Sequence, residues 1–229
     1  MKKLLLLLSP LFFIGCTVSQ KITYKTDDLS GSESSNTIPA MVEVRILEDN
    51  RANIEENAVL FDNPRQIKLD DEQTCINSEK HYNKEAVVNQ ITKIMVEHFN
   101  NAQLFKMSYY DQNPSSNYYL TGTLNSFYSE QKYSTGAAIG ASFGLIGALA
   151  TSGIKTPGDI IIDISDLKLY KKDGTLVRDF GNFYKEYNND FKTDANCWCA
   201  YWNANEMLKD FNTHLIEKIR IDIADIELE

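Results

Sequence analysis

The spacing of apolar residues along the chain predicts two amphipathic helices. In the segments 84–101 and 204–226 such residues recur at positions i, i+3 and i+4, which is the period of a helix that buries one face. Asn83 is a candidate N-cap of the first helix, and Asn203 with Glu206 forms a capping-box-like start of the second. We therefore expect both helices to pack against a core.

Alternation of apolar and polar residues predicts strands in the rest of the chain. It occurs in five segments: 41–49, 57–72, 104–111, 117–131 and 159–187. In the last of these, Asp173-Gly174 is a hairpin turn signal. The alternation slips by one residue near Ser165-Asp166, which predicts a β-bulge at that point.

The order of these elements indicates the fold class. Strands and helices do not alternate strictly, so we do not expect a doubly wound parallel sheet. We expect an α+β fold, with an antiparallel-rich mixed sheet of about five strands and the two amphipathic helices packed on one face. Residues 40–229 have the length of one domain of ordinary size.

An uncharged stretch interrupts the predicted strands. Residues 133–154 contain no charged side chain and lie between Lys132 and Lys155. A helical period and a strand period both fit this insert, so periodicity leaves its secondary structure open. As a helix, the insert would place glycine at every fourth position, which is a ridge that allows close helix packing.

The position of the insert between strands limits what it can do. A single membrane crossing would place the strands before and after it on opposite sides of a bilayer and split the sheet. We therefore expect either a hairpin that enters and leaves on one side or a small-residue loop packed on protein. The residues expected to contact a membrane or another protomer are Gly136, Ile139, Gly140, Phe143, Gly144, Ile146, Gly147 and Leu149.

The first residues, "MKKLLLLLSPLFFIGC", have the layout of a secretory signal. Two lysines precede an apolar core that is too short to span a bilayer. The ending Gly15-Cys16 resembles the bacterial lipobox, which implies cleavage after residue 15 and acylation of the Cys16 thiol, for example with palmitate. Because Thr17 rather than Asp follows, the resemblance implies the outer membrane. Residues 16–39 are polar and rich in Ser and Thr, which predicts a flexible tether.

Cleavage of the signal changes the charge balance. The chain has 23 basic and 32 acidic residues, and the loss of Lys2 and Lys3 leaves a net charge of −11. The basic stripe of a nucleic-acid-binding protein is absent, and an anionic lipid surface would repel this domain. We expect attachment to the membrane through the lipid anchor, with other envelope proteins or further copies of the chain as partners.

Three more cysteines fit an oxidising compartment. We expect one disulfide, from Cys75 to either Cys197 or Cys199, because a bridge within the C-x-C pair is sterically awkward. A thiolate metal site is the alternative, although no histidine clusters with the pair. The aromatic residues beside the pair form either an exposed patch or the cover of a core end: Trp198, Tyr201 and Trp202.

Motifs of enzymes do not appear in the sequence. It contains no glycine loop for phosphate and no G-x-S-x-G nucleophile motif. The histidines are scattered along the chain, at His81, His98 and His214, and His98 beside the first helix's apolar face is expected to be a core residue. We expect no catalytic residues, no cofactor and no metal.

The strands that flank the insert carry a resemblance. "NYYLTGTLNSFYSE" followed by "DIIIDISDLKLYKKDGTLVRDF" is similar to a pattern in small bacterial envelope lipoproteins of the YajG type, the auxiliary lipoproteins of ABC-type transport systems and the curli-secretion lipoprotein. The resemblance covers residues 40–226 in element order. It implies a non-enzymatic accessory or assembly subunit of an envelope machine. The alternatives are a ring- or pore-forming secretion component that uses residues 136–153, and a lipid- or glycan-binding module.

Overall fold

The computed structural model describes residues 23–26, 37–51, 74–76, 85–151, 153–193, 198–226 and 228. Its strands are β1 (Ile38–Val44), β2 (Glu48–Asp49), β3 (Thr74–Ile76), β4 (Phe105–Tyr110), β5 (Tyr118–Lys132), β6 (Lys155–Lys171) and β7 (Leu176–Lys192). Its helices are α2 (Val87–Asn101), α3 (Thr135–Ser142), α4 (Gly144–Thr151) and α5 (Cys199–Ile223).

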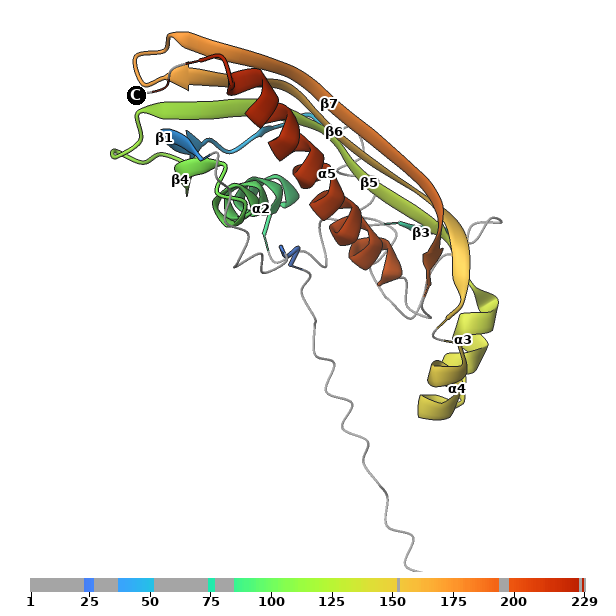
Figure 1. The fold of residues 1–229 in the computed structure, drawn as a ribbon. Coiled ribbons are helices and arrows are strands. Elements are labelled where there is room, and N and C mark those ends of the chain that lie inside the picture. The colour runs from blue at the N-terminus through green and yellow to red at the C-terminus, as the bar shows by residue number, and fades with distance from the viewer. Residues whose placement is uncertain are drawn as a thin grey trace, which may run out of the picture.

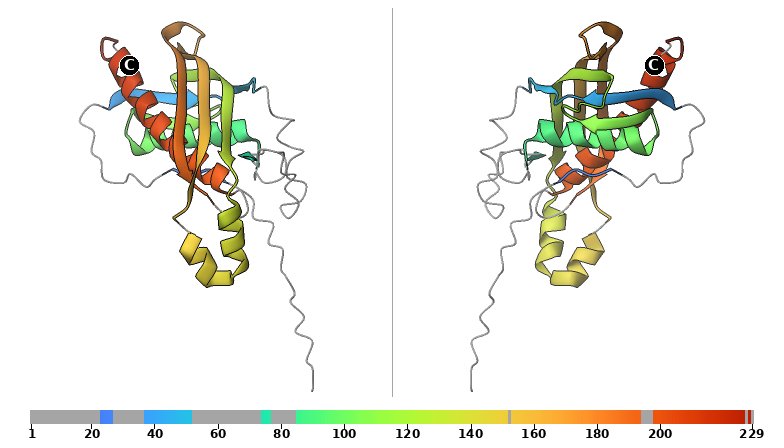
Figure 2. Two further views of the ribbon diagram at one scale, coloured as in Figure 1. Left: turned by 90° about the vertical axis from the view of Figure 1, so that its right-hand side faces the viewer. Right: turned by 90° about the vertical axis from the view of Figure 1, so that its left-hand side faces the viewer.

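The strands form one mixed sheet in the order β4-β1-β5-β6-β7, and the short strands β2 and β3 also pair with β5. Strand β1 is parallel to both of its neighbours, whereas β6 is antiparallel to both β5 and β7. Helices α2 and α5 lie on the same face of this curved sheet (Figures 1 and 2). The expected α+β class, with two substantial helices on a mixed sheet, is confirmed.

The core lies between the sheet and these two helices. The alternating apolar residues Leu120, Leu124, Ile160, Ile162 and Ile164 of β5 and β6 are fully buried. They meet apolar stripes at helical spacing on α2 and α5, namely Ile91, Met95, Phe99, Leu208, Leu215 and Ile219. Each such side chain gains about 1.5–3 kcal/mol on leaving water, so this layer is the main source of stability.

Two local irregularities of the β6–β7 hairpin agree with the sequence. The register of the pair shifts between Ile164 and Leu167, and Asp166 has a φ of 52°, so the bulge lies where it was expected. At the turn, Gly174 has a φ of 91°, which a residue with a side chain rarely adopts. The N–H of Thr175 donates to the Asp173 carboxylate at 2.9 Å and closes the turn.

Both helices begin at other residues than those expected. Helix α2 begins at Val87 with Ala86 at the N-cap, so the capping role expected for Asn83 is wrong. Helix α5 begins at Cys199, and Asn203 therefore lies inside it rather than at its cap. The Asn203 amide instead donates to Gln131 and to a carbonyl of β7, which explains why a good capping residue occupies a helical position.

Part of the expected tether packs on the domain. The backbone N–H of Tyr24 donates to the Gln90 side chain of α2 at 3.1 Å, and that of Lys25 donates to Asn205 of α5 at 2.7 Å. The Tyr24 ring is buried and makes an edge contact with Phe127, with centroids 4.9 Å apart. The signal segment 1–15, Cys16 and the strands expected in 57–72 lie outside the described residues.

Glu43 provides a test of the fold, because it is a carboxylate buried in β1. Burial alone would raise its pKa, but donors from Asn113 N–H at 2.9 Å, the Ser116 hydroxyl at 2.9 Å and the Arg45 guanidinium at 3.2 Å lower the pKa below the ordinary 4.5. We expect Glu43→Gln to lower the free energy of unfolding at pH 7 by about 1–3 kcal/mol.

The pH dependence of that loss has a defined sign. A depressed pKa stabilises the fold above the unfolded-state pKa, and this contribution is lost as the pH falls through the lower folded-state value. In urea titrations, the difference in unfolding free energy between wild type and Glu43→Gln should therefore shrink as the pH falls below the ordinary pKa of 4.5. The exposed Glu48→Gln serves as the control. An equal gap at neutral and acidic pH would contradict the assignment.

Candidate functional site

The uncharged insert folds as a pair of short helices. Helices α3 and α4 are antiparallel and extend beyond the end of the sheet (Figures 1 and 2). The Ser134 hydroxyl accepts from the N–H of Ala137 at 3.1 Å and caps α3. Gly144 joins the helices with a φ of 70°. Of the two secondary structures that the sequence left open, the insert has the helical one, in the form of a hairpin.

The two helices approach closely because glycines face each other. A Cβ on Gly147 would lie 1.9 Å from the carbonyl oxygen of Gly140, and a Cβ on Gly140 would lie 2.3 Å from Cγ2 of Thr151. Gly136 and Gly144 lie outside this crossing, since Gly144 forms the turn and Gly136 has only ordinary contacts. The two helices therefore cross at Gly140 and Gly147. They do not use the ridge of glycines at every fourth position that the sequence suggested.

The hairpin exposes large apolar side chains. Ile139, Phe143 and Leu149 are 56%, 75% and 66% exposed, whereas Ala137 is buried. The side chain of Ile146 lies outside the described part of the structure. Transfer of each exposed group out of water gives about 1.5–3 kcal/mol, which the domain itself does not use. None of the helices that the structure describes is long and apolar enough to cross a membrane.

Lysines surround the base of the hairpin. Lys132 ends β5, Lys155 begins β6 and Lys192 ends β7, and all three are exposed. Lys155 pairs directly with Lys192 across the two strands, a like-charge arrangement that costs stability. We call these three residues the lysine collar. The sequence indicated Lys132 and Lys155, but Lys192 joins them only through the β6–β7 pairing.

A buried polar contact fixes the base of the hairpin to the domain. Gln131, which is 1% exposed, donates to the carbonyls of Phe191 and Lys192 at 2.8 and 3.0 Å. Its side-chain oxygen accepts from Asn203 of α5 at 2.9 Å. The last residues of β5, the last residues of β7 and the first turns of α5 are therefore held together, which gives the hairpin a rigid base.

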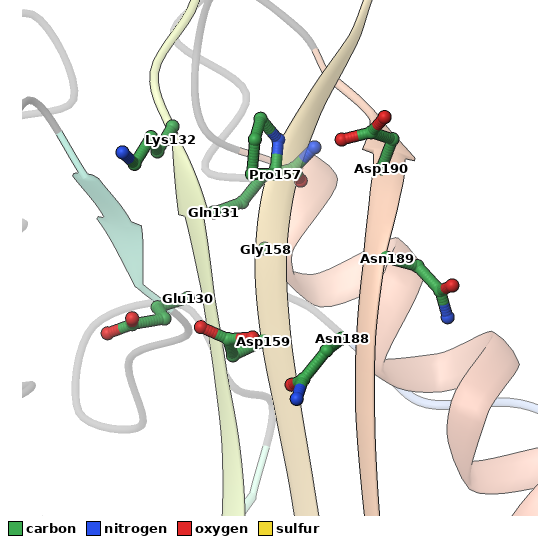
Figure 3. Close-up of a pocket in the computed structure, with 9 residues that line it drawn as sticks. All are labelled: Glu130, Gln131, Lys132, Pro157, Gly158, Asp159, Asn188, Asn189 and Asp190. Atoms are coloured by element: carbon green, nitrogen blue, oxygen red, sulfur yellow. The ribbon is translucent and has the colours of Figure 1, made fainter.

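A shallow polar cavity of about 450 Å³ lies next to the collar, on the ends of β5, β6 and β7 (Figure 3). Its walls carry the carboxylates of Glu130, Asp159 and Asp190 and the amides of Asn188 and Asn189, and the collar residue Lys132 also lines it. Within the described ranges, no group of three His, Cys, Asp or Glu side chains is arranged to hold a metal ion. The cavity is open and hydrophilic, and sequence reasoning did not indicate it.

Two of the candidate cysteines, Cys75 and Cys199, are among the described residues. Cys75 is buried and disulfide-bonded, whereas Cys199 carries a buried thiol, 3.8 Å from the Thr193 hydroxyl, so the partner of Cys75 is not Cys199. Cys16 and Cys197 lie outside the described residues.

The three aromatic residues beside the cysteine pair do not form one patch. Tyr201 is buried and Trp198 packs on the core, with the two rings 5.9 Å apart. Trp202 is 60% exposed. The structure therefore divides the three between core cover and surface, and Trp202 alone among them faces solvent.

Comparison with known proteins gives a distant likeness of fold. No family model and no curated protein matches the chain. Protein XCC0632 of the family DUF330 from Xanthomonas campestris is 10% identical, with a TM-score of 0.47 over 90% of this chain and 97% of that one. A PelC dodecamer from Paraburkholderia phytofirmans is 9% identical, with a TM-score of 0.30 over 78% and 89%.

A presumed lipoprotein from Caulobacter crescentus CB15 is 12% identical, with a TM-score of 0.30 over 59% of this chain and 81% of that one. One of these three structures is thus described as a lipoprotein. Similarity at this level concerns the fold, and no function is transferred from it.

Gly147→Ala tests the packing of the hairpin. The added methyl group meets the Gly140 carbonyl, so the two helices must separate. We expect amide hydrogen exchange in residues 135–151 to accelerate by roughly tenfold or more. The free energy of unfolding of the sheet should not change. Gly153→Ala is the matched control, because its Cβ has no atom within 4 Å. Equal exchange in both variants would show that the crossing is not close.

Proposed function

We propose that this chain is a non-enzymatic lipoprotein of the bacterial outer membrane, attached through acyl groups on Cys16. In this proposal it acts as an accessory or assembly subunit of an envelope machine. The observation that carries the proposal is the hairpin, with Ile139, Phe143 and Leu149 exposed on a rigid base. Exposed apolar side chains of this kind serve contact with another molecule or a membrane, because they do not pack against the core of the domain.

Several polar side chains of the described residues are engaged in contacts within the fold. Gln131 and Asn203 are used to join strands and helix, and Glu43 binds three donors within the fold. Asp210 accepts from Lys185 at 2.6 Å and from the Tyr187 hydroxyl at 2.7 Å, which lowers the pKa of the carboxyl although burial opposes this. These groups stabilise the structure and are not arranged as an acid–base pair beside the cavity.

A ring-forming component is the second candidate, and the same exposed side chains favour it. Ile139 and Phe143 would then pack against the next copy, and the hairpins would line the assembly. The native mass of the detergent-solubilised protein separates the candidates. An accessory subunit runs as a monomer, a dimer or a complex with unrelated chains, whereas a large homo-oligomer supports the ring.

Cys16→Ser tests the anchor on which the proposal depends. Wild-type protein expressed in a bacterium that processes lipoproteins should incorporate labelled palmitate and remain in the outer-membrane fraction. Cys16→Ser should incorporate none and be released in soluble form or remain unprocessed. Cys199→Ser is the control, because it removes a thiol that is not part of a disulfide and leaves the acylation site intact. Absence of labelled palmitate from the wild-type protein, or equal labelling of Cys16→Ser, would oppose the proposal.

A further inference from the structure

We infer that the α3–α4 hairpin is a second membrane anchor, which inserts from one side into the same leaflet that holds the acyl groups on Cys16. The inference rests on the proposed acylation of Cys16 and goes beyond it by naming what the exposed surface of the hairpin contacts. That contact partner is the acyl-chain and headgroup region of a phospholipid leaflet. A second copy of the chain is the competing occupant, and the experiment below distinguishes the two.

The length of the tether places the leaflet near the hairpin. Thr23 follows Cys16 by seven positions, which span at most about 25 Å. The segment 23–26 is docked on α5 and on Phe127 of β5. Phe127 lies five residues from Lys132 at the hairpin base, which is about 17 Å along the strand. The acyl groups are therefore within reach of the level at which α3 and α4 leave the sheet.

The order of chemical groups toward the tip matches the layers of a leaflet. The hairpin is uncharged and exposes apolar side chains. The lysine collar follows at its base, in the position where phosphate groups would lie, and lysines at such ends extend toward the interface. The carboxylates Glu130, Asp159 and Asp190 come two to four residues farther along the strands, about 7–13 Å from the collar.

The repulsion between the lysines of the collar favours the binding of an anion. Lys155 and Lys192 face each other across β6 and β7, and within the described residues no carboxylate forms an ion pair with either of them or with Lys132. A phosphate group between them would relieve their repulsion, so the collar attracts an anionic surface at close range although the net charge of −11 repels it at longer range. An apolar contact with a second copy would require no such group, and it would bring two collars of the same sign toward each other.

The length of the helices and the neighbouring aromatic residue fit insertion from one side. Each helix has eight residues, or about 12 Å, which reaches into one leaflet but does not cross the bilayer. Exposed Trp202 lies in the first turn of α5, next to Asn203, which contacts Gln131 at the hairpin base. Tryptophan prefers the interface between lipid and water.

The proposal is tested with tryptophan probes in the full acylated chain. In a background that carries both Trp198→Phe and Trp202→Phe, Phe143→Trp places the only tryptophan on the hairpin. Leu176→Trp places it instead at the turn of the β6–β7 hairpin, at the opposite end of the strands (Figure 1). The protein is reconstituted into vesicles of equal parts phosphatidylethanolamine and phosphatidylglycerol with brominated acyl chains. We expect the Phe143→Trp emission to shift to shorter wavelength and fall by roughly half, with Leu176→Trp unchanged.

A second measurement uses unacylated Cys16→Ser protein that begins at residue 16, so that the apolar signal segment is absent, and flotation with the same vesicles. The pair Phe143→Ser and Leu149→Ser should lower the partition coefficient by about tenfold or more, whereas Leu176→Ser should leave it unchanged. Replacing the three collar lysines by Gln should weaken binding to these vesicles more than binding to vesicles of phosphatidylcholine alone.

The outcomes separate the two proposals. If the acylated chain floats with vesicles but its Phe143→Trp probe is not quenched, the hairpin inference is overturned and the lipid anchor stands. If the acylated chain does not float, the anchor itself fails. If the probe shifts in the absence of lipid, in step with concentration-dependent self-association, a second copy covers the hairpin and the inference is again overturned.

Discussion

The pairing of β5 with β6 is the constraint on which the arrangement of this molecule depends. The two strands pair from Tyr118 and Lys171 at one end to Gln131 and Gly158 at the other. The segment that connects β5 to β6 must therefore begin and end at neighbouring positions, at one end of the two strands. The uncharged insert therefore forms a hairpin rather than a span, and Lys132 and Lys155 come to lie on either side of it. The carbonyl contacts of Gln131 extend the same constraint to β7 and α5.

The sequence predicted the features that depend on local patterns. The apolar stripes of α2 and α5, the bulge at Asp166 and the turn at Gly174 each depend on residues a few positions apart, and all appear in the structure. The exclusion of a single membrane crossing followed from the order of strands. The helical form of the insert did not follow, because small residues fit helical and strand periods equally well.

Features that depend on distant residues were not predictable. Gly147 is essential to the hairpin because it meets Gly140, and no spacing rule identifies that pair before the helices are known. Lys192 reaches the collar through pairing with Lys155, and Tyr24 is buried by contacts with residues more than sixty positions away. Asn203 is a residue type that often caps helices, but here its side chain donates to Gln131, which is distant in the sequence. Tertiary contacts override local preference in each case.

Two anchors at one end of the domain would give it a fixed orientation. The proposed acyl groups alone would leave the domain free to rotate, whereas a hairpin inserted beside them would hold the strands at a set angle to the membrane. The sheet face opposite α2 and α5 would then be presented in a constant direction, with the carboxylates of the polar cavity just above the interface (Figures 1 and 3). Such presentation suits a subunit that assembles with other envelope proteins.

Hydrogen exchange of the native acylated protein in lipid nanodiscs is the most direct test of this account. Amides of residues 135–151 should exchange more slowly in nanodiscs than in unacylated protein free in buffer, while amides at the β6–β7 turn should exchange equally in both. Equal exchange of residues 135–151 in the two states, with the protein demonstrably attached to the nanodisc, would contradict the claim that the hairpin meets the bilayer.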